Sequence, residues 1–101
     1  MISVYVTFPS QKAAQALARK VVAERLLACA NLFPITSIYR WKSKLVEAKE
    51  WAMIGKCDKG KLRQVEKRIL ELHPYKVPCI VWHEEKATPK YAAWVRETGR
   101  R

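Results

Sequence analysis

Residues 29–57, CANLFPITSIYRWKSKLVEAKEWAMIGKC, contain the stretch that decides the fold of this chain. Two extended segments, 29–41 and 45–57, flank the short polar segment 42–44, which suits a hairpin turn. Strands in globular proteins average about 5–6 residues, so both segments are unusually long. We therefore expect a hairpin that projects beyond the domain carrying it.

Pro34 lies inside the first of these long strands. Proline has no backbone N–H to donate to a neighbouring strand, and inside sheets it is confined to edges and bulges. The sequence therefore predicts that this strand is bulged at Pro34 or forms an edge of the sheet.

The rest of the chain alternates between segments with the composition of strands and segments with the 3.6-residue hydrophobic period of helices. Segments 2–8 and 77–83 are rich in β-branched and aromatic residues and predict strands. Apolar residues at helical spacing predict helices at 10–27, 60–72 and 89–97. The resulting order, β-α-β-β-α-β with a closing helix, is the split βαβ pattern. We predict an α+β, ferredoxin-like fold with a long hairpin between its second and third strands.

The length of 101 residues predicts a single domain spanning 1–101. A chain of this size buries roughly two thirds of its unfolded surface, so it needs no disulfide framework or metal to fold. The first residues lack the basic region and cleavage site of a signal peptide. No apolar run approaches the ~20 residues that a membrane span requires. We expect a cytoplasmic protein without a membrane partner.

The charge is strongly unbalanced, with 20 Lys and Arg against 9 Asp and Glu and a net charge of +11. Such a field attracts polyanions, including nucleic acids. The basic residues are nevertheless dispersed from Lys12 to Arg101, which is typical of a solvated surface. RNA-recognition domains share the predicted topology, but segment 50–55 lacks their aromatic-glycine motif. A basic nucleic-acid-binding module remains the alternative function.

The sequence contains no motif that indicates catalysis. His73 and His83 are the only imidazoles, and neither lies in a nucleophile elbow or triad motif. Three scattered glycines cannot build a phosphate-binding loop. We predict that the protein is not an enzyme.

Metal binding is the more specific hypothesis. Cu(I) and Zn(II) prefer thiolate and imidazole ligands, so the candidate metal ligands for copper or another divalent cation are His73, Cys29, Cys57 and Cys79. If the turn centres near Ser43, Cys29 and Cys57 become cross-strand neighbours, because each lies 14 residues from it. The favoured alternative is that all three cysteines are small buried hydrophobic residues, as free cysteines often are. His73 also suits the C-terminal end of a helix through the helix dipole.

Large aromatic side chains are concentrated on the predicted hairpin. Tyr39, Trp41 and Trp51 present faces that favour burial, and a small domain cannot cover them. We expect these residues to lie at an interface between identical subunits. Clefts between such subunits often hold ligands.

Several short motifs follow one another in a specific order: residues 6–9, 24–32, 37–44, Glu50, Lys56, 73–75, 77–78, Tyr91 and Trp94. In their order and spacing they resemble the CutA family over nearly the whole chain. The resemblance implies a ferredoxin-like subunit in a tight homotrimer, held together partly by strand pairing between subunits. It also implies a link to tolerance of copper and other divalent cations. Similar trimers among PII-type signalling proteins suggest a sensing or regulatory role by analogy.

The chain departs from the family pattern at four positions. Val6 stands where copper-binding members have Cys, and Leu72 stands where a second His precedes the His-Pro-Tyr motif. Cys79 replaces a frequent Glu, and Ser43 replaces the usual Gly of the hairpin turn. Among the metal ligands that the family would supply, the resemblance leaves His73.

Overall fold

The structure is a computed structural model that describes residues 1–100; Arg101, the last residue of the predicted domain, lies outside the described residues. Its elements, in chain order, are β1 (Ile2–Phe8), α1 (Gln11–Ala23), β2 (Cys29–Trp41), β3 (Lys44–Cys57), η1 (Lys59–Lys61), α2 (Leu62–Leu72), β4 (Ile80–Glu84) and α3 (Pro89–Thr98). The four strands form one antiparallel sheet in the order β2-β3-β1-β4. The predicted ferredoxin-like fold is confirmed.

Three element boundaries differ from the prediction by two residues or more, for identifiable reasons. Helix α1 begins after Ser10, whose hydroxyl accepts a hydrogen bond from the Ala13 amide at 3.1 Å, but ends before Leu27 because Arg25 adopts a left-handed φ of 62°. Helix α2 begins at Leu62, because a 3₁₀ turn precedes it. Strand β4 begins at Ile80 rather than at residue 77, after Pro78, which has no N–H to donate.

The β2–β3 hairpin is as long as predicted, and its ladder is unbroken. Pairing runs from Cys29 opposite Lys56 to Trp41 opposite Lys44 without a bulge, so Pro34 is accommodated because β2 is an edge strand. The turn consists of Lys42 and Ser43 alone. Both residues have positive φ, 49° and 66°, as a tight two-residue hairpin turn requires.

The predicted pairing of Cys29 with Cys57 is wrong by one residue. The turn is centred between Lys42 and Ser43 instead of on Ser43, so Cys29 lies opposite Lys56. A shift of one residue moves a side chain to the other face of the sheet. Cys57 therefore points into the core, and Cys29 points to the opposite face.

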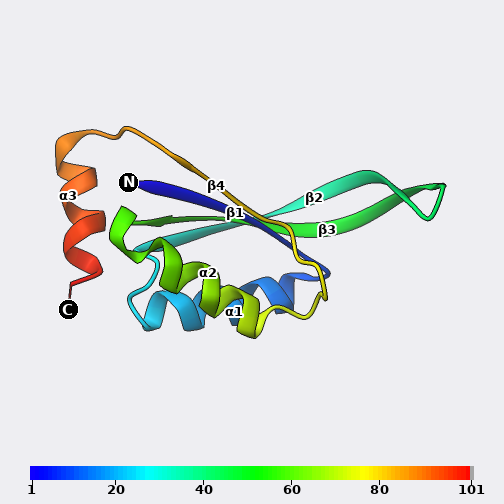
Figure 1. The fold of residues 1–101 in the computed structure, drawn as a ribbon, viewed down its shortest axis with the longest axis horizontal. Helices are drawn as coiled ribbons and strands as arrows, with labels where there is room; N and C mark the ends of the chain where they lie inside the picture. The colour runs from blue at the N-terminus through cyan, green and yellow to red at the C-terminus, as the bar shows by residue number, and fades with distance from the viewer. Residues whose placement is uncertain (101) are drawn as a thin grey trace.

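Helices α1 and α2 cover one face of the sheet (Figure 1). The core lies between them and the sheet. From the sheet it receives alternate residues of β1 together with Met53 and Cys57 of β3. From the helices it receives Leu17 and Val21 of α1 and the apolar stripe of α2. The helix-covered face of the sheet is thus shielded from solvent. We call the other face of the sheet the open face.

The hairpin extends well past the helices, at the end of the molecule opposite α3 (Figure 1). It makes the molecule 45 Å long in its longest dimension against 24 and 21 Å in the others. Within residues 1–100, no helix has the length and apolar character needed to cross a membrane.

Candidate binding cleft on the open face of the sheet

A cleft of about 660 Å³ lies where the hairpin meets the segment between α2 and β4. Strands β1, β2 and β3 supply one side of it, and the α2–β4 segment supplies the other. Its lining residues are Thr7, Tyr39, Trp41, Glu50, Pro74, Tyr75, Lys76, Val77 and Cys79. Thr7 faces the cleft because strand side chains alternate, and its neighbours Val6 and Phe8 are buried under the helices.

A chain of hydrogen bonds fixes one wall of the cleft. The His73 Nε2 atom lies 2.7 Å from the Thr7 carbonyl oxygen, and the Tyr75 amide donates to His73 Nδ1 at 3.1 Å. Because Nδ1 accepts, Nε2 carries the proton and donates to Thr7. The Tyr75 hydroxyl then donates to Glu50 Oε2 at 2.8 Å. The Thr7–His73–Tyr75–Glu50 chain thus ties the α2–β4 segment to two strands.

His73, a predicted metal ligand, is structural in this arrangement. Its side chain is 8% exposed and stacks on Phe8 with a centroid distance of 4.9 Å. Both of its ring nitrogens are engaged in the hydrogen-bond chain. A metal ion would have to displace one of these two bonds, so the folded subunit presents no free nitrogen of His73.

The electrostatics of the cleft are set by Glu50. Burial, and then the hydrogen bond to Glu50, raise the pKa of Tyr75 to about 12. Burial, followed by the nearby Cys79 and Glu50, raises the pKa of Tyr5. The ion pairs among residues 1–100 do not include Glu50. The cleft is lined by one carboxylate, Glu50, and one ammonium group, Lys76, on a strongly basic chain.

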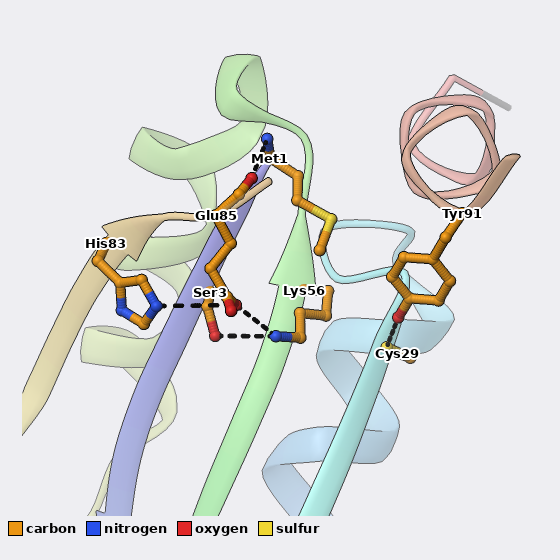
Figure 2. Close-up of polar contacts among 7 residues, drawn as sticks. All are labelled: Met1, Ser3, Cys29, Lys56, His83, Glu85 and Tyr91. Carbon is orange, nitrogen blue, oxygen red and sulfur yellow. Dashed lines mark hydrogen bonds and ion pairs between the residues drawn. The ribbon is translucent and has the colours of Figure 1, made fainter. Parts of the chain in front are cut away.

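The three cysteines lie in three different environments. Cys79 is exposed and lines the cleft. Cys57 is buried in the core, where burial raises its pKa to about 11. The Cys29 Sγ atom lies 3.3 Å from the Tyr91 hydroxyl oxygen of α3 (Figure 2). The described part of the chain brings no three His, Cys, Asp or Glu residues together into a metal-binding group.

A second polar cluster surrounds the C-terminal end of β4 (Figure 2). The Lys56 ammonium lies 2.5 Å from Glu85 Oε1 and donates to the Ser3 hydroxyl at 3.2 Å. The Glu85 amide also donates to the Met1 carbonyl at 2.9 Å. Hydrogen bonds from Lys56 and Ser3 lower the pKa of Glu85. These contacts link three strands, and we interpret the cluster as structural.

The predicted interface aromatics fall on both faces of the sheet. Tyr39 and Trp41 are exposed on the hairpin and line the cleft. Trp51 is half-buried against the core on the helix-covered face, where it lies near Pro9 and Pro34. The three residues therefore do not form one patch in the subunit.

Glu50 and Tyr75 were not predicted as site residues and entered the sequence analysis only through the family resemblance. Their contact joins residues 25 positions apart. The available signal was the His-Pro-Tyr run directly after a helix, since its proline prevents the helix from continuing and turns Tyr75 back toward the sheet.

The comparisons with known proteins agree with one another. The family model for "CutA1 divalent ion tolerance protein" matches residues 2–98. The divalent-cation tolerance protein CutA of Thermotoga maritima is 40% identical over 99 residues, covering 97% of this chain and 98% of that protein. A crystal structure of CutA1 from Pyrococcus horikoshii matches with a TM-score of 0.94 at 35% identity, over 100% of both chains. The PII-like protein CutA from Nostoc sp. PCC 7120, in apo form, matches with a TM-score of 0.93 at 29% identity, over 99% of this chain and 98% of that one.

Proposed function

Because this chain belongs to the CutA1 divalent ion tolerance family, we propose that it is one subunit of a homotrimer that binds or senses copper or other divalent cations and has no catalytic activity. The observation that carries the proposal is the projecting end of the hairpin. Ile38, Trp41 and Leu45 are 63%, 62% and 76% exposed there. Isolated two-stranded ribbons are marginally stable in water, so this end requires a partner surface.

A second copy of the chain is the partner that the sheet favours. Strands β2 and β4 are its two edges, and each has unpaired backbone groups along one side. Val81 on β4 is also exposed on the open face. Head-to-tail contacts between two different edges form a ring when the rotation between subunits closes, and a closed ring leaves no edge free to extend a fibre. A relative named PII-like supports the same kind of assembly.

Cys79 is the residue we assign to metal contact. Of the four predicted ligands, it is the exposed one that lies in the cleft, and Glu50 is the carboxylate donor there. Two donors do not complete a tetrahedral site, so water or a neighbouring subunit would supply the rest. The absence of catalysis is part of the proposal, because the cleft contains no nucleophile paired with a free imidazole base among the described residues.

We also propose a cytoplasmic location. Cys29, Cys57 and Cys79 are all unpaired thiols. Thiols persist in a reducing compartment, whereas secreted domains of this size commonly use disulfides.

Two measurements test the proposed function. Sedimentation equilibrium at micromolar concentration should give the mass of three subunits; a mass of one subunit would refute the trimer. Calorimetric titration of the reduced protein with Cu(I), Cu(II) and Zn(II) should show binding that Cys79→Ser removes and Cys57→Ser leaves in place. Equal binding by the wild-type and Cys79→Ser proteins would reject the assignment of Cys79.

A further inference from the structure

A groove of about 630 Å³ lies between α1 and the C-terminal end of α2. Its lining includes Ala16, Leu17, Arg19 and Lys20 of α1, together with Leu72 and Pro74 where α2 ends. Both helices lie on the face of the sheet that is opposite to the open face (Figure 1). The assembly proposed above uses the hairpin and the two edge strands, so it does not require a neighbouring subunit to cover this groove.

The floor of the groove is apolar and recessed. Leu17 is 4% exposed, and Leu72 is half-buried and packs against the core. An alkyl chain that lies on such residues gains roughly fourfold in affinity for each methylene group that it buries completely. The volume of the groove lies in the range of small-molecule sites, so the groove can hold one chain of several carbons.

The charges that line the groove have a single sign. Arg19 and Lys20 line it, and no carboxylate within residues 1–100 does. Neither cation forms an ion pair in the described part of the chain. Glu24, one helical turn after Lys20, accepts hydrogen bonds from Arg68 at both carboxylate oxygens, at 2.9 and 2.8 Å. Glu71 lines a separate hollow on α2. The groove therefore favours an anionic group over a cationic one.

The α2 side of the groove is fixed before a ligand arrives. Leu72 and Pro74 flank His73 in the chain. The Thr7 carbonyl and the Tyr75 amide hold the two ring nitrogens of this histidine, at 2.7 and 3.1 Å. Groups that are already fixed lose little conformational entropy on binding, so their contacts contribute more of their energy to affinity.

We propose that the groove binds a single-chain amphipathic anion of the alkyl carboxylate class, with its chain on Leu17 and Leu72 and its carboxylate beside Arg19 and Lys20. A nucleic acid would contact the two cations and leave the apolar floor without a role. A membrane surface needs apolar side chains that protrude, whereas Leu17 is recessed. The inference goes beyond the proposed function, because it concerns a different ligand at a site that one subunit forms alone.

The test compares octanoate with octylammonium and with butyrate, by calorimetry and by NMR shifts of the backbone amides of α1. Octylammonium has the same chain length and the opposite charge, so octanoate should bind at least about tenfold more tightly. Butyrate has the same charge and four fewer methylene groups, so octanoate should again bind at least about tenfold more tightly. Equal affinity within either pair, or no binding of octanoate, overturns the inference.

Charge variants locate the binding. The double variant Arg19→Gln, Lys20→Gln should weaken octanoate binding about tenfold, because each exposed ion pair contributes up to about fivefold. The double variant Arg63→Gln, Lys67→Gln removes the same charge from an exposed part of α2 and should leave the affinity within about twofold. Equal weakening by the two double variants would reflect the net charge alone and overturns the inference.

A second pair of variants adds charge in place of removing it. Ala16→Glu puts a carboxylate into the lining, four residues before Lys20, and should weaken octanoate binding about tenfold. Ala23→Glu, at an exposed position of α1 outside this groove, should leave the affinity within about twofold. Unchanged affinity in Ala16→Glu overturns the inference.

Two further outcomes are distinct. Anionic vesicles or a single-stranded oligonucleotide that bind through Arg19 and Lys20, with no binding of octanoate, would assign these cations to a larger polyanion and overturn the inference. A monomeric protein that binds octanoate refutes the trimer and supports the inference, whereas a trimer that does not bind octanoate overturns the inference alone.

Discussion

The two halves of the β2–β3 hairpin share one continuous ladder but have opposite environments. In the inner half, residues 29–34 pair with 51–56 under the helices, and Met53 is fully buried. In the outer half, residues 35–41 pair with 44–50 beyond the helices, and Leu45 is 76% exposed. The backbone pairing of β2 with β3 continues where no helix covers the side chains. Strand pairing in this hairpin therefore does not depend on burial of its side chains.

The comparison indicates where each function of the hairpin resides. The inner half contributes to the stability of the subunit through apolar burial. The outer half leaves its apolar residues for a partner, and its residues Tyr39, Trp41 and Glu50 line the cleft. We therefore assign the proposed assembly to the part of the hairpin that the core does not use.

The largest expected effect tests the inner half. Met53→Ala removes a fully buried side chain and should lower the free energy of unfolding by about 2–5 kcal/mol, measured by denaturant titration. Lys49→Ala, at an exposed polar position on the outer half, is the control and should change this free energy by about 0.5 kcal/mol or less. Equal losses in the two variants would contradict the division into halves.

The next effect tests the outer half. Trp41→Ala should weaken the proposed assembly by about 2–4 kcal/mol, since truncation of a buried aromatic anchor typically costs that much. Sedimentation equilibrium over a range of protein concentrations measures the change. Trp94→Ala, on a helix at the other end of the molecule, should leave the mass unchanged. A normal assembly in Trp41→Ala would remove the outer half from the interface.

A smaller effect probes the tightness of the inner half. A Cβ atom at Gly55 would lie 2.6 Å from Leu27 Cδ1, and Leu27 is itself fully buried. We expect Gly55→Ala to cost about 1–3 kcal/mol of unfolding free energy through overpacking. The control is Gly60→Ala, where the nearest atom is 3.6 Å away. If the two variants unfold at the same denaturant concentration, the core around Leu27 adapts more readily than we infer.

The smallest effect concerns the junction of the two halves, where Tyr75 contacts Glu50. Loss of this hydrogen bond in Tyr75→Phe should cost about 0.5–1.5 kcal/mol at neutral pH. The folded-state pKa of Tyr75, about 12, lies above its ordinary value of 10.0, so the folded protein holds this proton more tightly than the unfolded chain. The resulting stabilisation is complete below pH 10 and is lost as the pH rises toward 12.

Urea titrations between pH 9 and pH 12 measure this dependence. Wild-type stability should fall more steeply over that range than the stability of Tyr75→Phe. Parallel curves for the two proteins would show that Tyr75 does not contribute to the alkaline loss.

Much of the fold followed from local patterns in the sequence. Strands β1 and β2 lie at the predicted residues, because their β-branched and aromatic runs end at Pro9 and at a polar turn. The end of α1 was missed because Arg25, a residue with no special turn preference, adopts the left-handed conformation that glycine usually supplies. The start of β4 depended on how the α2–β4 segment crosses the sheet, which is a tertiary property.

The candidate site was less predictable. Register decided the outcome for Cys29 and Cys57, and register depended on whether the turn has two residues or three. His73 has the right chemistry for metal binding, but hydrogen bonds to the distant Thr7 carbonyl and to the neighbouring Tyr75 amide use both of its nitrogens. The Tyr75–Glu50 contact depends on the same register and on a loop conformation. The candidate metal ligands could be recognised from their residue types, whereas the residues that they contact in the folded chain could not.

The central position of β1 has a consequence for the order of folding. Ile2 pairs with Cys57 on one side and with Glu84 on the other, whereas Trp41 pairs with Lys44 across a two-residue turn. Closing a long loop costs more entropy than closing a short one. We therefore expect the β2–β3 hairpin to form from its turn inward before β1 pairs with β3 and β4. The tip with Trp41 and Leu45 would then be formed before the core exists, so early pairing between nascent hairpins competes with correct folding.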